Sequence, residues 1–253
     1  MKHLFAFIFL LLSLHALSQV EGFISVNGHF GLSGLSKTEF DSDIDSYYPI
    51  VFYDGTKSAI QSGGIQLSGG VRLLDRFSIS MGFSIMRRGM QTDFGYNTSP
   101  YSYYYGRDIK LTLDYYAIPV ITQVHFLSKR NLTLNVGIIP GRLDSAVFQG
   151  DMTFAHELTP VGDWGYDEVS EYDWTSRLNP KSLIGLLGIE YEFIISEYVS
   201  IPLGVSYQFD FKKLGIWSRN REFEISDLKN WGYYFNLGLK FSFGKQNSLS
   251  ETH

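Results

Sequence analysis

The segment from Tyr233 to Phe243 alternates between two kinds of side chain over its whole length. Every odd-numbered position is apolar, whereas the even-numbered positions include Asn236, Lys240 and Ser242. Because successive side chains of a β-strand point to opposite faces, the segment predicts a strand with one apolar and one polar face. A sheet of such strands suits a membrane, where the apolar face contacts lipid and the polar face turns inward.

Similar segments recur along the chain, and together they predict eight strands. The strands are expected at residues 24–32, 65–73, 77–85, 111–126, 132–138, 182–193, 199–209 and 233–243. The fourth segment changes phase near Tyr115 and Tyr116 and contains Pro119, which cannot donate a ladder hydrogen bond. We therefore expect a β-bulge there. An amphipathic helix is the alternative for any single segment, but period two recurs too often for helices.

The connections between these segments alternate in length without exception. The long ones span residues 33–58, 91–110, 144–181 and 211–230, and the short ones span 74–76, 128–131 and 195–197. Short periplasmic turns and long extracellular loops are typical of outer-membrane barrels. The sequence thus predicts an all-β fold, an eight-stranded antiparallel up-and-down transmembrane β-barrel. A secreted lipocalin-like barrel is the rival, and it would need an apolar interior and a polar exterior.

The first 18 residues resemble a secretory signal peptide. Lys2 precedes an apolar run from Leu4 to Leu14, and small residues precede an expected cleavage site after Ser18. Residues 19–253 then form a single barrel domain in the bacterial outer membrane. The chain has no Cys, which excludes a disulfide and a lipoprotein acyl group. Its formal net charge of −5 gives no reason to expect a nucleic-acid partner.

Charged residues lie on the predicted polar face and therefore inside the barrel. They are Arg72, Arg88, Asp114, Glu190, Glu192, Asp210 and Lys240. The interior of an eight-stranded barrel is just wide enough for side chains, and buried ions there must be paired. We interpret these residues as a structural ion-pair network, with Arg72, Lys240, Glu190 and Glu192 near one depth. A gated polar path or a proton relay is the functional alternative.

Tyrosines gather in the first two long connections. They are Tyr47, Tyr48, Tyr53, Tyr101, Tyr103, Tyr104 and Tyr105. Tyrosine offers a large contact area at low entropic cost and is enriched in binding loops, so these residues form a candidate recognition surface. Packing of loop against loop, or an aromatic belt at the membrane interface, would use the same residues.

Catalytic, cofactor-binding and metal-binding sites are not predicted. His125 and His156 belong to different ends of the barrel, and no spacing matches a metal-binding helix or a nucleophile elbow. Asp41, Asp43 and Asp45 have the acidic spacing of a calcium loop, but the Gly and terminal Glu that such a loop requires are absent. A lipid A or peptide hydrolase at the barrel rim remains the enzymatic alternative.

Three stretches resemble the PorT-like outer-membrane β-barrel family, part of the wider OmpX/OmpA-like group of small barrels. They are DYYAIPVITQ in the fourth strand, LTLNVGIIPGRLDSA in the fifth, and NLGLKFSF at the end. The resemblance implies an outer-membrane barrel, and some members of that family serve secretion or gliding machinery. It supplies no functional motif that can be carried over residue by residue.

The expected function is that of a non-enzymatic outer-membrane barrel with a structural, surface-recognition or scaffold role through its extracellular loops. Its expected partners are outer-membrane lipid, lipopolysaccharide, and a protein or glycan bound at the loops. We expect a monomer without a cofactor. A small-solute channel ranks below the hydrolase, because a lumen closed by ion pairs leaves no continuous path.

Overall fold

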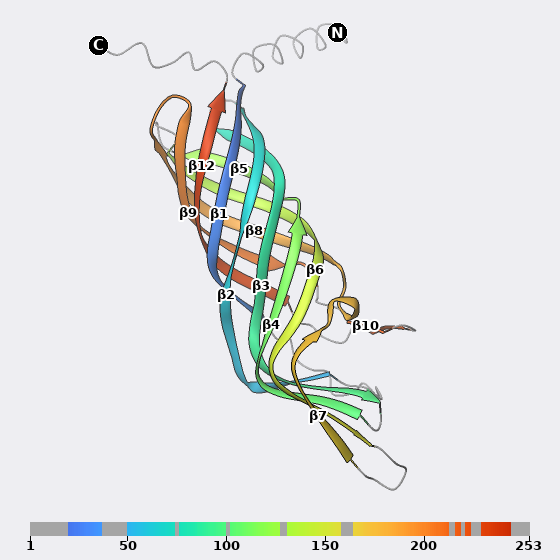
Figure 1. Ribbon diagram of the computed structural model, residues 1–253. Helices are drawn as coiled ribbons and strands as arrows, with labels where there is room; N and C mark the ends of the chain where they lie inside the picture. Colours follow the sequence, from blue (N-terminus) through green and yellow to red (C-terminus); the bar gives the residue numbers. More distant parts are fainter. Residues whose placement is uncertain are drawn as a thin grey trace, which may run out of the picture.

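The computed structural model describes residues 20–36, 50–73, 76–99, 102–126, 131–157, 164–212, 216–218, 221–223 and 229–243. The predicted signal peptide, residues 1–18, lies outside these ranges, as do Asp41, Asp43, Asp45, Tyr47, Tyr48 and Tyr101. The described residues form β-strands and one short 3-10 helix (Figure 1). None of the helices among them is long and apolar enough to cross a membrane.

The long strands of the first half are β1 (Glu21–Ser36), β2 (Ile50–Leu73), β3 (Phe77–Ser99), β4 (Ser102–Ala117), β5 (Val120–Phe126) and β6 (Leu132–Glu157). The second half contributes β7 (Trp164–Asp173), the 3-10 helix η1 (Thr175–Arg177), β8 (Lys181–Ile194), β9 (Val199–Asp210), β10 (Ile216–Ser218), β11 (Arg221–Phe223) and β12 (Lys229–Phe243).

Strand pairing closes the sheet on itself. Every pairing is antiparallel, and around the ring the order is β1, β2, β3, the pair β4 and β5, then β6, β8, β9 and β12. β4 and β5 share one position, because both pair with β3 on one side and with β6 on the other. Among the described residues, eight strand positions therefore form a closed up-and-down barrel, as predicted.

The division between β4 and β5 falls at Ile118 and Pro119. Pro119 cannot donate to the ladder, although its carbonyl accepts a hydrogen bond from the Gly82 amide at 3.1 Å. The register of β4 against β6 shifts between Asp114 and Tyr115, close to the predicted β-bulge, but the extra residue there is Asp144 of β6. Across Pro119 itself the register is continuous, so no bulge lies at that residue. The predicted change of phase is wrong, because odd-numbered residues such as Tyr115 and His125 are buried on both sides of the break.

The outer wall around the lower barrel is apolar. The odd-numbered residues of β12 face outward as expected, with Tyr233 62% and Leu237 51% exposed, whereas the even-numbered Lys240 is buried. The same alternation holds in β3, where Phe83 is exposed and Ser84 is buried. The alternating stretch of β12 from Tyr233 to Phe243, tilted near 40°, rises about 25 Å, which matches the apolar thickness that outer-membrane barrels present to lipid. The fold is thus a transmembrane β-barrel.

Above this belt the polarity of the wall reverses. In β4 the inward residues Leu111 and Leu113 are buried and apolar, whereas Lys110 on the outer face is exposed. The inward side chains of β4, β6 and β8 join one apolar cluster, in which the ring of Phe148 packs edge-on against Trp174 at 4.9 Å. A soluble protein has this arrangement, and the reversal therefore marks the edge of the lipid-facing belt.

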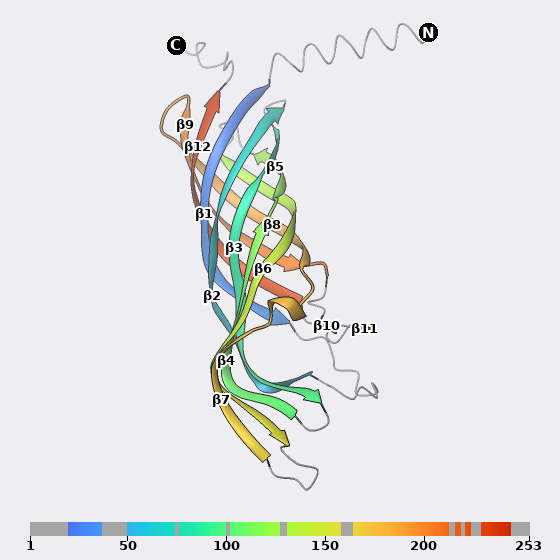
Figure 2. The same ribbon diagram turned by 45° about the vertical axis from the view of Figure 1, so that its right-hand side comes forward.

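One side of the barrel wall is much taller than the other. Figure 1 and Figure 2 show β2, β3, β4, β6 and β7 continuing past the ends of β8, β9 and β12 as a curved sheet, with the start of β1 and the end of β12 at the opposite end. We call this extension the projecting sheet. It replaces two predicted loops, because residues 91–110 pair as β3 with β4 and much of 144–181 pairs as β6 with β7. Backbone pairing rather than free loop dominates this side of the molecule.

The wall polarity gives a direct labelling prediction. Cys introduced at Leu237 or Leu239 should resist a membrane-impermeant maleimide in lipid vesicles, because these side chains face hydrocarbon. Cys at Gln149, on the exposed outer face of β6 above the belt, should react quickly and serves as the control. Fast labelling at Leu237 would contradict the lipid-facing assignment and favour a soluble barrel.

Candidate functional site: a polar network across the lumen

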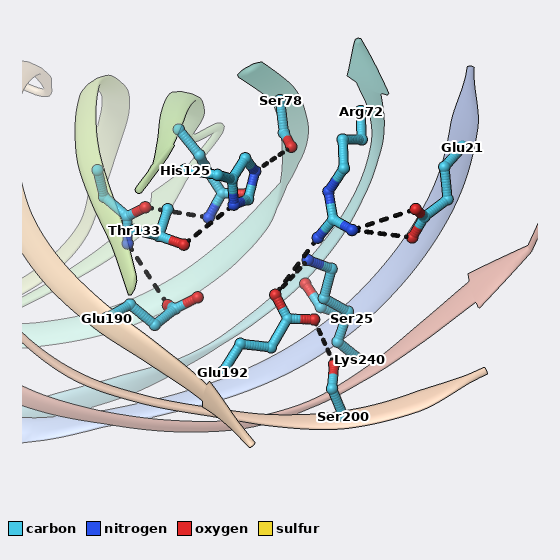
Figure 3. Close-up of polar contacts among 12 residues, drawn as sticks. Glu21, Ser25, Arg72, Ser78, His125, Thr133, Glu190, Glu192, Ser200 and Lys240 are labelled. Atoms are coloured by element: carbon cyan, nitrogen blue, oxygen red, sulfur yellow. Dashed lines mark hydrogen bonds and ion pairs between the residues drawn. The ribbon is translucent and has the colours of Figure 1, made fainter. Parts of the chain in front are cut away.

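Four charged side chains meet inside the lower barrel, near the end where β1 begins and β12 ends. Arg72 on β2 donates to both oxygens of Glu21 on β1, with its Nη1 3.1 Å from Oε2. The other terminal nitrogen of Arg72 lies 3.4 Å from Oε2 of Glu192 on β8, and Nζ of Lys240 on β12 lies 3.1 Å from the same oxygen. The positive charges of two cations thus balance the negative charges of two carboxylates (Figure 3).

Polar and aromatic neighbours complete this cluster. The Ser200 hydroxyl donates to Oε1 of Glu192 at 2.5 Å, so both oxygens of that carboxylate are occupied. The ammonium of Lys240 also lies 4.5 Å above the ring of Phe23, a cation–π contact. All four charged side chains are at most 8% exposed. Burial of this degree is tolerable for ions only when each one is paired, as here.

The pair between Arg72 and Glu192 spans the barrel. β2 and β8 lie four strand positions apart in either direction around the ring, so they stand on opposite walls. A second ion pair spans the barrel higher up, where Nη1 of Arg88 on β3 lies 2.5 Å from Oδ1 of Asp210 on β9. The backbone amide of Asn230 donates to the other oxygen of Asp210 at 3.2 Å. These two bridges tie opposite walls together through the lumen.

His125 belongs to a third polar group of the lower lumen, which it forms with two hydroxyl side chains. Its Nε2 is 2.6 Å from the hydroxyl of Ser78, and its Nδ1 is 3.1 Å from the hydroxyl of Thr133. In serine hydrolases a serine nucleophile is likewise hydrogen-bonded to a histidine base, but there a carboxylate orients the histidine through its second nitrogen. Here Thr133 stands at the second nitrogen, and both hydroxyls are buried.

His156 is far from this group. It lies on the projecting sheet, where its ring stacks on Phe154 at 5.4 Å, whereas His125 is opposite Thr133 at the other end of β6. The structure therefore does not bring the two histidines together. Within the described ranges, no three His, Cys, Asp or Glu side chains are grouped closely enough to hold a metal ion.

The charged residues that the sequence places in the lumen have three different surroundings: five are paired there, Glu190 is in the lumen without an ion pair in the described part of the chain, and Asp114 is outside it. Arg72, Glu192, Lys240, Arg88 and Asp210 lie in the lumen and form the contacts given above. Glu190 also faces inward, but it accepts a hydrogen bond from the Asn135 amide at 3.4 Å and forms no ion pair among the described residues. Asn135 in turn accepts a hydrogen bond from Gln123 at 3.0 Å.

Asp114 is the exception, and its predicted place in the lumen is wrong. Its neighbours Leu113 and Tyr115 face inward, so Asp114 faces outward, where its Oδ1 lies 2.7 Å from Nε of Arg87. Arg87 is 61% exposed, which makes this a surface ion pair. The assumption that polar residues point inward fails at Asp114, because this part of β4 lies above the lipid-facing belt.

Glu21 is the member of the network that the sequence reasoning missed. It lies directly opposite Arg72 in the register of β1 and β2. The predicted first strand begins only at residue 24, where apolar alternation becomes evident. Glu21 nevertheless continues the inward row of Phe23 and Ser25, and extension of that row by one step would have identified it.

The tyrosines of the candidate recognition surface remain a prediction. Tyr47, Tyr48 and Tyr101 lie outside the described residues. The backbone of Tyr53 belongs to β2, and Tyr103, Tyr104 and Tyr105 belong to β4, in the part of the wall that forms the projecting sheet.

Comparison with known proteins finds similarity of structure only. No family model matches the chain, and no curated protein matches its sequence. Among solved structures, Ail of Yersinia pestis is 14% identical, with 88% of this chain and 98% of Ail covered, at a TM-score of 0.41. The outer membrane protease OmpT from Escherichia coli is 11% identical, with 88% and 96% covered, at a TM-score of 0.45. These values do not transfer a function to this chain.

Removal of Arg72 should destabilise the barrel strongly. Arg72→Met leaves Glu21 without a cation and Glu192 with Lys240 alone, so we expect a loss of about 3–5 kcal/mol in unfolding free energy. Urea unfolding of the refolded barrel in vesicles measures it. In the double variant with Glu21→Gln the loss should shrink, because the orphaned carboxylate is removed as well. Additive losses would show that Arg72 and Glu21 are not coupled.

Adjacent arginines of β3 provide a matched comparison. Both Arg87 and Arg88 pair with an aspartate, but Arg88 is 1% exposed and Arg87 is 61% exposed. Arg88→Met should cost about 3–5 kcal/mol of unfolding free energy, because it leaves Asp210 buried without its counter-ion. Arg87→Met should cost less than about 1 kcal/mol, since solvent screens an exposed pair. Equal losses of unfolding free energy in the two variants would contradict the assignment of Arg88 to the lumen and Arg87 to the outer surface.

Proposed function

We propose that the chain is a non-enzymatic barrel of the bacterial outer membrane that anchors the projecting sheet at the cell surface. The signal-like N-terminus, the lipid-facing belt and the closed ring support this location. The end with the termini and the short turns then faces the periplasm. In this orientation the projecting sheet extends outward, where a surface-recognition or scaffold role would be exercised.

The filled lumen is the observation that carries this proposal. Ion pairs cross the lower barrel at Arg72 and the middle at Arg88, and the apolar cluster fills the space above. A channel needs a continuous polar path, and these side chains occupy the path. The side chains available for contact with a partner therefore lie on the outside of the molecule, and the projecting sheet offers an extended surface beyond the membrane.

The resemblance to PorT-like proteins supports a finer version of the same proposal, attachment to secretion or gliding machinery. Under it, the partner is a protein or a glycan held by the projecting sheet. The enzymatic alternative has weaker support, because the serine–histidine contact found in the described part of the chain, between Ser78 and His125, is buried in the lower lumen.

Photo-crosslinking in intact cells tests the proposed surface role. A crosslinking residue at Gln149, on the exposed outer face of the projecting sheet, should give a defined adduct with a second molecule. The matched control is Ser196, an exposed residue of the turn between β8 and β9, which lies at the opposite end of the barrel. The adduct from Gln149 should be absent from the control.

Two outcomes would contradict the proposal. Adducts of the same mass from both positions would show that the projecting sheet is not a specific surface. Planar-bilayer recording of the refolded protein should show no steady conductance, and a steady large conductance would favour the channel alternative.

A further inference from the structure

A groove is open on the lipid-facing wall, where β5, β6, β8 and β9 run side by side. Its volume is about 410 Å³, and its lining is apolar apart from Thr122. Val136 and Ile138 of β6 form one side, and Phe209 of β9 with Phe211, just beyond the end of that strand, forms the other. Val136 and Ile138 are 45% and 47% exposed, so the groove opens directly onto the surrounding lipid.

A glycine forms the floor of this groove. Gly185 of β8 stands opposite Ile138 in the strand register, within the outward row that also contains Leu187. The ring of Phe209 lies across it, so close that an added Cβ would sit 2.4 Å from a ring carbon. The missing side chain lets the Phe209 ring lie against the wall at this point, and a flexible hydrocarbon chain fits the open apolar groove beside the ring.

Two cations lie above the groove, outside its lining. Along the outward row of β6, Arg142 follows Ile138 by four residues, about 13 Å of strand. Lys181 of β8 stands directly opposite Arg142 in the register, and both side chains are exposed. Like charges in opposed positions destabilise a sheet. This juxtaposition suggests that an anion normally lies between them.

No carboxylate of the described chain neutralises these cations. Asp144, the next outward residue of β6, is exposed but forms no ion pair with Arg142 or Lys181 in the part of the chain that the structure covers. The nearby carboxylate of Asp114 is already held by Arg87 and by the hydroxyl of Ser145. A third exposed cation, Lys212, directly follows Phe211 of the groove.

We propose that this wall is a binding site for lipid A, the phosphorylated glycolipid of the outer leaflet. One acyl chain lies in the groove, and Arg142 and Lys181 bind a phosphate at the level where the apolar belt ends. The vertical order matches that lipid, with hydrocarbon below and anionic phosphate above. The inference rests on the proposed outer-membrane location, because the leaflet at this level is the outer one.

Native mass spectrometry of the refolded barrel with purified lipid A tests the phosphate contacts. The double variant Arg142→Gln with Lys181→Gln should retain lipid A roughly tenfold more weakly, because two charge-assisted contacts are lost. The control is Arg76→Gln with Lys110→Gln, which makes the same change of charge at exposed positions away from the groove. The control should bind like the parent protein.

A second pair of variants tests the groove itself. Val136→Trp fills it, whereas Leu67→Trp places the same side chain on the lipid-facing surface of β2, outside the groove. Only Val136→Trp should weaken lipid A retention. Heat-modifiable migration on a detergent gel shows that each variant is folded, so a loss of binding is not mistaken for misfolding.

Three results would overturn the site. They are equal retention by the double glutamine variant and its control, equal retention of dephosphorylated lipid A, and equal retention of phosphatidylglycerol. The last two would indicate an ordinary lipid contact without selection for the phosphorylated glycolipid. If the parent protein inserts into membranes but shows these results, only the lipid site fails. If it remains soluble and heat-insensitive, the proposed function fails first.

Discussion

The narrowness of an eight-stranded barrel is the constraint on which the rest of this structure depends. Closing eight strands leaves an interior wide enough for side chains and little else. In this chain Arg72 reaches from β2 to Glu192 on β8, and Arg88 reaches from β3 to Asp210 on β9, each across the full width of the ring. Long cationic side chains can bridge such a lumen only because the walls are close, and once inside they cannot be hydrated. Each must therefore meet a carboxylate.

Two different driving forces stabilise the two parts of the wall. In the lower barrel the apolar side chains face outward, so lipid supplies their apolar environment and the interior is held by hydrogen bonds and ion pairs. In the upper wall the apolar residues turn inward and pack on one another, as Phe148 does on Trp174. The fold changes from a membrane protein to a soluble sheet along the same strands, without a break in backbone pairing.

This change explains where sequence reasoning succeeds and where it fails. Period two predicts the facing of β3 and β12 because the geometry of a strand leaves no other choice. Odd-numbered residues face inward both in β4 and in β5, but the apolar residues move from the inward face to the outward face. If apolar residues are assumed to face outward everywhere, this exchange is mistaken for a change of phase. Asp114 was misplaced for this reason. Glu21 was missed because it precedes the first residue of the apolar alternation, so the pattern itself does not include it.

The predicted loops failed for a related reason. Residues 91–110 are polar and aromatic without clean alternation, yet most of them pair as β3 with β4. Above the lipid no face has to be uniformly apolar, so backbone pairing continues where the sequence signal fades. The tall wall that results leaves the barrel with two specific outer surfaces, the projecting sheet in water and the groove in lipid. Since the lumen is occupied by its own charges, the proposed recognition and lipid binding are assigned to those surfaces. Evolution of function in such a barrel is therefore expected to change the upper halves of β2, β3, β4 and β6, while the inward ions of the lower halves stay coupled to one another.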